Sequence, residues 1–159
     1  MVPTLNIEDR VLVIKNTIIN NEIDYGDIVV FYSPESDYKK NLNKEIFESF
    51  MVWKVFDKSS DLHTALIKRV VGLSGDEVLI KANGEVFVND IKFVVPNIEQ
   101  GTYLTEQTYL VPENEIFLLG DNRINSQDSR YIGTVSINNV LGKAHYIIYP
   151  FDNFTNLDD

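Results

Sequence analysis

The chain contains no cysteine, which excludes disulfide bonds, thiolate catalysis and cysteine-based metal sites. Its two histidines, His63 and His145, share no motif with other metal-binding side chains, and no P-loop or G-x-S-x-G pattern is present. No apolar run approaches the roughly 18 residues that a membrane-spanning helix needs. Positive charge is also scarce, and a net charge of −10 argues against generic binding to nucleic acid or to an anionic bilayer.

The chain is rich in β-branched and aromatic side chains, with 8 Tyr and 9 Phe against only 5 Pro. This composition favours sheet over helix, and 159 residues suit one domain, or one domain with an appended lobe. Short apolar runs are separated by polar turns such as Asn83-Gly84, a two-residue hairpin signal. We therefore predict a mainly β, antiparallel fold. The expected strands cover residues 7–19, 28–32, 65–71, 77–80, 86–88, 91–95, 116–119 and 140–149.

One segment, about residues 37–56, has a helical rather than a strand pattern. Its apolar side chains recur at helical spacing, at Leu42, Ile46, Phe50 and Trp53. This periodicity predicts one amphipathic helix that packs on the core, or whose aromatic side chains rest in a membrane interface. Residues 99–108 are polar and predict a loop, and the residues after Pro150 predict a frayed end.

Lys68 stands inside the apolar segment Ala65-Leu66-Ile67-Lys68-Arg69-Val70-Val71-Gly72. In a strand its side chain shares a face with those of Leu66 and Val70, and an ammonium between apolar neighbours has a lowered pKa. A lysine has an ordinary pKa of about 10.4 and becomes a useful base only when this falls to about 7 to 8. The same pattern also fits a surface lysine whose stem lies along a sheet edge.

A long polar loop, Gly120-Asp121-Asn122-Arg123-Ile124-Asn125-Ser126-Gln127-Asp128-Ser129-Arg130, follows an apolar strand. Asp121 and Asn122 can satisfy loop backbone groups with their side chains. Ser126 offers a hydroxyl that can accept a hydrogen bond from a lysine amine. Asp128 and Arg130 can pair if this segment is extended. A polar surface hairpin is the plainer alternative for the whole loop.

These two segments, together with Met1-Val2-Pro3-Thr4-Leu5, resemble in the same order the motifs of the type I signal peptidases. Members of that family are membrane-anchored serine proteases with a Ser/Lys dyad. The resemblance implies a signal-peptidase-like β core over about residues 1–76 and 113–150, with an inserted β-rich extension over about residues 77–112. It also implies no metal or organic cofactor.

The resemblance assigns roles to individual residues. Lys68 is expected to be the general base, Ser126 to orient Lys68, and the Asp128–Arg130 pair to support the site. The expected substrate-binding residues are Met1, Val2, Pro3, Leu66 and Ile67. The implied reaction is removal of signal peptides from exported preproteins, after small residues at positions −1 and −3 of the substrate.

The nucleophilic serine of the family stands immediately before the methionine that matches Met1. We therefore expect this chain to be inactive and soluble by itself, and its parent to be anchored by an N-terminal segment with the catalytic domain on the extracytoplasmic side. A non-catalytic relative that binds signal peptides or partners is the main alternative. A self-cleaving repressor-type peptidase is a third, but the DNA-binding module and the cleavable segment of that class are not found in the sequence.

Overall fold

The computed structural model describes residues 1–15, 23–32 and 65–158. The predicted helix near residues 37–56 lies outside these residues. No helix among the described residues is long and apolar enough to cross a bilayer. The strands are β1 (Arg10–Lys15), β2 (Ile28–Tyr32), β3 (Ala65–Gly72), β4 (Glu77–Ile80), β5 (Val86–Val88), β6 (Ile91–Phe93), β7 (Gln107–Leu110), β8 (Glu115–Leu119), β9 (Val135–Ser136), β10 (Val140–Tyr149) and β11 (Thr155–Asn156). Helix α2 covers Ser129–Ile132, and 3-10 turns cover Ile137–Asn139 and Phe151–Asn153.

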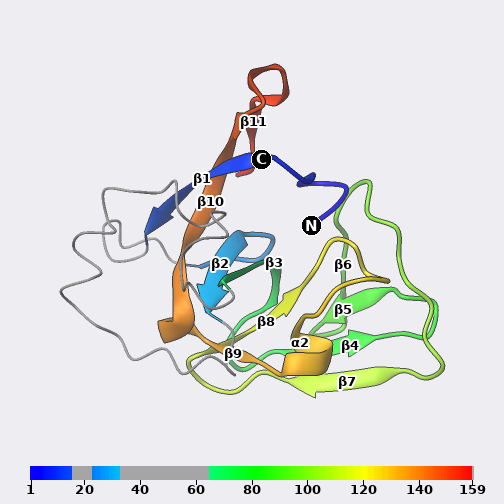
Figure 1. The fold of residues 1–159 in the computed structure, drawn as a ribbon. Coiled ribbons are helices and arrows are strands. Elements are labelled where there is room, and N and C mark those ends of the chain that lie inside the picture. The colour runs from blue at the N-terminus through cyan, green and yellow to red at the C-terminus, as the bar shows by residue number, and fades with distance from the viewer. Residues whose placement is uncertain (16–22, 33–64, 159) are drawn as a thin grey trace.

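The described strands form two antiparallel sheets, so the mainly antiparallel β prediction is confirmed. The larger sheet has the order β1-β10-β2-β3-β8-β9, with β11 also paired to β10. The smaller sheet has the order β6-β5-β4-β7 and lies on the side of the larger one where β8 and β9 are, away from β1 (Figure 1). All of its strands fall between residues 77 and 110, within the predicted extension.

Strand β3 is the central element because its side chains reach three separate hydrophobic clusters. Val70 is buried in a cluster with β2 and β8, and Leu66 packs against the same cluster. Ile67 packs against a second cluster, which includes Leu5, and Val71 belongs to a third, which the smaller sheet shares. The predicted alternation of faces along this strand is therefore confirmed, and both sheets are fixed to the strand that carries Lys68.

The edge of β3 is paired unevenly. On one side, the whole segment from Ala65 to Arg69 pairs with β2. On the other side, β8 pairs only from Arg69 onward, where Arg69 lies opposite Leu119. Within the described residues, the stretch from Ala65 to Lys68 therefore has no strand partner on the β8 side.

Several predicted boundaries are wrong. Residues 7–9 precede β1 and are not strand, and β6 ends at Phe93. Strand β7 begins at Gln107, inside the stretch predicted as loop. The chain after Pro150 is not frayed, because it forms a 3-10 turn and then β11, and the amide of Leu157 donates to the carbonyl of His145 at 2.8 Å.

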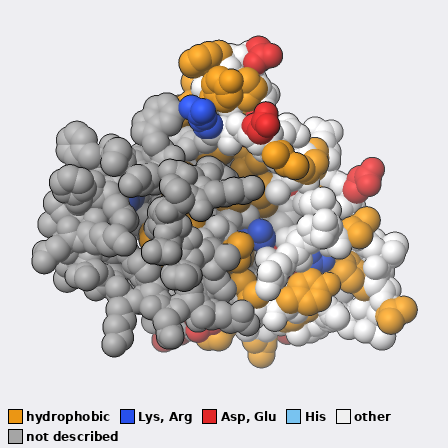
Figure 2. Space-filling model, viewed as in Figure 1, with side chains coloured by type: hydrophobic (Ala, Val, Ile, Leu, Met, Phe, Trp, Pro, Cys, Tyr) orange, Lys and Arg blue, Asp and Glu red, His pale blue; other side chains and the backbone are white. Residues whose placement is uncertain are grey.

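The C-terminal hairpin projects from the body of the molecule, where Figure 2 shows hydrophobic side chains gathered at the top. The side chains of Phe151 and Phe154 are 83% and 64% exposed. Phe154 stacks on Tyr146 with ring centroids 5.7 Å apart, so aromatic packing adds to the strand pairing between β10 and β11 at this end.

Candidate active site

Lys68 is partly buried on β3, and its Nζ donates a hydrogen bond to the carbonyl of Ile67 at 3.0 Å. Burial lowers the pKa of Lys68, while the negative charges of Asp128 and Asp121 act in the opposite direction. The burial effect prevails because an ammonium loses solvation when apolar side chains replace water. Lys68 is thus a lysine whose proton is held less tightly than usual.

Met1 lies close enough to Lys68 for the two charges to interact. Burial lowers the pKa of the Met1 amino group, and the positive charge of Lys68 lowers it further, whereas Asp121 raises it. A turn closed by the Leu5 amide, which donates to the Met1 carbonyl at 3.0 Å, holds this segment. Met1 and Ile67 pack against the same hydrophobic cluster. The fold therefore brings the first residue of the chain beside the central strand.

Of the other predicted substrate-binding residues, some pack against the core and some lie at the surface. Val2 is 44% exposed and Pro3 is also exposed, so neither is tied into the core. Leu66 shares its face of β3 with Lys68 and is half-buried against the cluster around Val70. Met1, Ile67 and Leu66 border the Lys68 region, whereas Val2 and Pro3 are at the surface beside it.

The predicted hydrogen bond from Lys68 to Ser126 is not formed in this structure. Ser126 Oγ is buried and has no hydrogen-bond partner among the described residues. Its side chain lies directly against Gly120, where an added Cβ would overlap both Oγ and Cβ of Ser126. The glycine thus makes room for this hydroxyl.

Asp128 and Arg130 form a buried ion pair, although the segment is not extended as expected. Asp128 is instead the N-cap of α2, and its carboxylate accepts from Arg130 Nε and Nη2 at 2.7 Å each. The same carboxylate accepts from the Gly120 amide at 2.9 Å. The two side chains are 0% and 3% exposed. This forked pairing with a backbone contact fixes both ends of the loop against each other.

A second buried pair was missed from the sequence. Arg69 donates to both carboxylate oxygens of Asp121, at 3.0 and 2.8 Å, and to the carbonyl of Gly26 at 2.7 Å. Thr4 donates from its hydroxyl to the same carboxylate, so Asp121 joins the N-terminal turn to β3 rather than serving its own loop. A second cation next to Lys68 in an apolar strand was the signal for a buried acidic partner.

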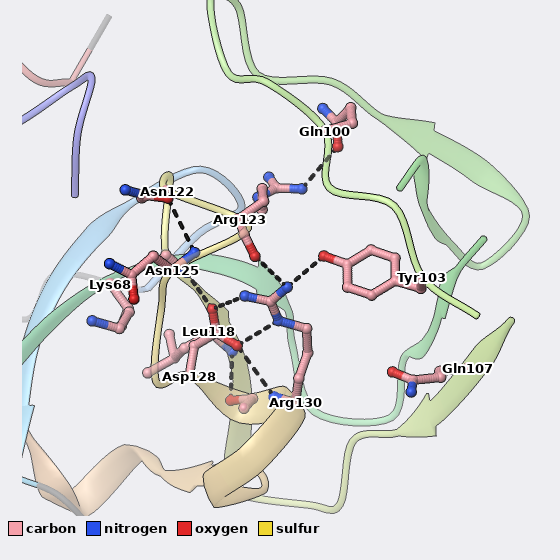
Figure 3. A network of polar contacts seen from close by, with 12 residues as sticks. Lys68, Gln100, Tyr103, Gln107, Leu118, Asn122, Arg123, Asn125, Asp128 and Arg130 are labelled. Carbon is pink, nitrogen blue, oxygen red and sulfur yellow. Dashed lines mark hydrogen bonds and ion pairs between the residues drawn. The ribbon is translucent and has the colours of Figure 1, made fainter. Parts of the chain in front are cut away.

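Two further contacts reach the loop from the segment between β6 and β7. Arg130 Nη1 donates to the hydroxyl of Tyr103, and Arg123 Nη1 donates to Gln100 Oε1 at 3.1 Å. Figure 3 shows the guanidinium of Arg130 between Asp128 and Tyr103. Nothing in the sequence indicated these partners, because the segment was predicted as a plain loop.

The described residues hold no group of three or more His, Asp or Glu side chains arranged to bind a metal. The site consists instead of a partly buried amine, a buried hydroxyl and two buried arginine–carboxylate pairs. Such a site can take a proton from a hydroxyl nucleophile once the amine is neutral.

The chain is similar in sequence to known proteins along most of its length. The family model described as "Signal peptidase, peptidase S26" matches residues 1–149. A probable signal peptidase I-2 of Synechocystis sp. is 33% identical over 156 residues, which cover 94% of this chain and 59% of that protein. Signal peptidase I of Leptolyngbya laminosa is 31% identical over 157 residues, which cover 99% of this chain and 68% of that protein. The chain thus spans about two thirds of the length of these relatives or less.

The fold also has a counterpart among solved structures. A signal peptidase I from Enterococcus faecalis V583 superposes with a TM-score of 0.54 and 24% sequence identity. The match covers 77% of this chain and 97% of that one. At this identity the likeness concerns the fold alone.

Proposed function

This chain belongs to the signal peptidase family, peptidase S26, and we propose that it is the part of a signal peptidase I that carries the general base. The observation that carries the proposal is the placement of Lys68. Its pKa is lowered by burial, and it lies beside Met1, the position next to which the family places its nucleophile.

In the proposed reaction, the nucleophile is the hydroxyl of a serine immediately before Met1. Neutral Lys68 takes the proton of that hydroxyl, and the alkoxide attacks the scissile carbonyl to give a tetrahedral intermediate. Collapse of the intermediate releases the mature protein's amine, which receives the proton from Lys68, and leaves an acyl-enzyme that water then hydrolyses. Ser126 orients the amine of Lys68 during these steps.

The substrate is proposed to be an extended signal-peptide segment that adds a strand to β3. Support comes from the edge of β3 on the β8 side, where residues 65–68 have no partner among the described strands. Main-chain hydrogen bonds at such an edge bind any extended peptide, and side-chain pockets add selectivity. Leu66, Ile67 and Met1 are proposed to shape shallow pockets that accept small side chains at −1 and −3.

The location of the whole protein follows from the same proposal. A membrane anchor preceding Met1 would hold the catalytic domain on the extracytoplasmic side, where signal peptides emerge from the bilayer. The acidic surface implied by a net charge of −10 gives no electrostatic attraction to anionic lipid, so binding at the membrane would depend on that anchor.

The test uses the chain extended at its N-terminus so that a serine directly precedes Met1. This protein is expected to cleave a preprotein with alanine at −1 and −3 in detergent, and the chain that starts at Met1 is expected not to. Lys68→Ala and Lys68→Arg should each abolish cleavage, because arginine keeps the charge and cannot act as a base near neutral pH. Cleavage by the Lys68→Arg protein would remove lysine from the mechanism.

Ser126→Ala provides the second arm of the test. It should reduce the rate severalfold and leave the melting temperature nearly unchanged, because Ser126 Oγ makes no hydrogen bond that folding depends on. Full activity of the Ser126→Ala protein would contradict the orienting role. An extended wild-type chain that binds signal peptide and never cleaves it would favour the non-catalytic alternative.

A further inference from the structure

The segment between β6 and β7 reaches across to the active-site loop through one tyrosine. The hydroxyl of Tyr103 accepts a hydrogen bond from Arg130 Nη1, and the same nitrogen donates to the carbonyl of Arg123 at 2.7 Å. The other two nitrogens of Arg130 are occupied by Asp128, at 2.7 Å each. Tyr103 thus holds the guanidinium on the side away from Asp128 (Figure 3).

Asp128 transmits its position to the site in two ways. It is fully buried and accepts from the Gly120 amide at 2.9 Å, which places Gly120 against Ser126. The negative charge of Asp128 also acts on Lys68 and raises the pKa of that lysine, against the effect of burial. If Arg130 moved, Asp128 would shift with it, or the negative charge of Asp128 would be less well neutralised. Either change would alter the surroundings of Lys68.

Tyr103 is itself fixed to the smaller sheet rather than to a free loop. Its amide donates to the carbonyl of Ala82 at 2.8 Å, and its ring packs against the core cluster that contains Val78 and Val86. Nearby, Gly84 approaches the carbonyl of Gly101 so closely that a Cβ at position 84 would overlap it. The tyrosine therefore presents its hydroxyl from a rigid base.

We propose that Tyr103 is a positioning residue for the peptidase reaction. It holds the Arg130–Asp128 pair, and through that pair it keeps Lys68 and Ser126 in position for proton transfer. The inference rests on the proposed function. It gives the smaller sheet a part in the chemistry, although that sheet contributes no group that would touch the reacting atoms. The second link, from Arg123 to Gln100, supports the same loop from the same segment.

The kinetic test compares Tyr103→Phe with Tyr109→Phe in the extended chain. Tyr109 is the matched control, because its hydroxyl lies near enough to Arg130 and Asp128 for their charges to act on it, yet it donates to Gln107 at 2.7 Å rather than to either of them. Tyr103→Phe is expected to lower kcat roughly tenfold at neutral pH, with KM nearly unchanged, as expected when a hydrogen bond to a charged group is lost. The pH–rate profile should also move to higher pH, because a less balanced Asp128 carboxylate favours the charged form of Lys68.

A second measurement does not depend on catalysis. Hydrogen exchange of the Gly120 amide, which Asp128 protects, should be severalfold faster in Tyr103→Phe than in wild type and unchanged in Tyr109→Phe. An unchanged Gly120 exchange rate, or a kinetic loss with no movement of the pH profile, would overturn the positioning role. Failure of the extended wild type to cleave any preprotein would instead overturn the proposed function, while the exchange experiment would still decide the coupling.

Discussion

The two arginine–carboxylate pairs at the candidate site contrast with the charged cluster near the C-terminus. At the site, Arg69 pairs with Asp121 and Arg130 with Asp128, and both carboxylates are completely buried. Near the C-terminus, Lys143 contacts Asp27 at 2.7 Å and Asp158 at 3.2 Å, and His145 contacts Asp158 at 2.7 Å. Asp158 is 30% exposed.

The difference shows which side chains a protein uses where water is excluded. The buried pairs use arginine, whose fork contacts both oxygens of a carboxylate and whose remaining donors find backbone carbonyls. The C-terminal cluster uses lysine and histidine, and the carboxylate that they share, Asp158, is partly open to solvent. Breaking a buried pair leaves an uncompensated charge, whereas breaking an exposed one returns both groups to water. The following predictions test this contrast, from the largest expected effect to the smallest.

Asp128→Ala should cause the largest change. It leaves the Arg130 guanidinium buried without its carboxylate, and we expect a loss of about 3 to 5 kcal/mol in the free energy of unfolding. Activity of the extended chain should fall as well. Urea denaturation measures the stability, with Asp158→Ala as the matched loss of a carboxylate from the exposed cluster. Equal losses of unfolding free energy in the two variants would show that the buried and the exposed pairs contribute alike, contrary to this prediction.

Lys68→Met should have an effect of opposite sign. Burial lowers the pKa of Lys68, so the charged form is disfavoured in the folded state, and replacement should stabilise the protein by about 1 kcal/mol at neutral pH. The penalty is fully present below the folded pKa and vanishes as the pH rises through the unfolded value of about 10.4. Wild-type stability relative to Lys68→Met should therefore increase with pH across that window.

Denaturation of both proteins between pH 6 and pH 10 measures this effect. Lys92→Met is the control, because the side chain of Lys92 is 51% exposed and its ion pair with Glu85 lies at the surface. A Lys68→Met protein less stable than wild type at every pH would show that Lys68 contributes to the fold rather than being maintained at its expense.

Asp158→Asn should have the smallest effect, below about 1 kcal/mol, because exposed ion pairs are weak. Although partial burial raises the pKa of Asp158, hydrogen bonds from His145 and Lys143 lower it overall. The stabilisation is thus present above the unfolded pKa and is lost as the pH falls through the folded value. Added salt should reduce it further. Asp152→Asn, an exposed neighbour, is the control, and an equal acid sensitivity of the two variants would contradict the assignment.

The sequence correctly predicted the mainly antiparallel β class and the alternation of faces along β3. Alternation of faces around Lys68 depends only on the period of two in a strand, and the structure confirms it. The loop from Gly120 was harder, because Asp128 and Arg130 also fit an extended hairpin. They pair instead across the first turn of a short helix, where Asp128 caps a free backbone amide.

Local pattern therefore determined which segments of this chain are strands and where an amine stands among apolar side chains. Only the tertiary structure decided which charges meet. Arg69 and Asp121 lie 52 residues apart, and Tyr103 and Arg130 lie 27 apart. Their contacts depend on how the two sheets and the N-terminal turn pack around β3. That packing cannot be predicted from the spacing of residues within a short segment of the sequence. The physical reason is that hydrophobic burial is non-directional, whereas an ion pair or hydrogen bond needs two specific atoms within about 3 Å.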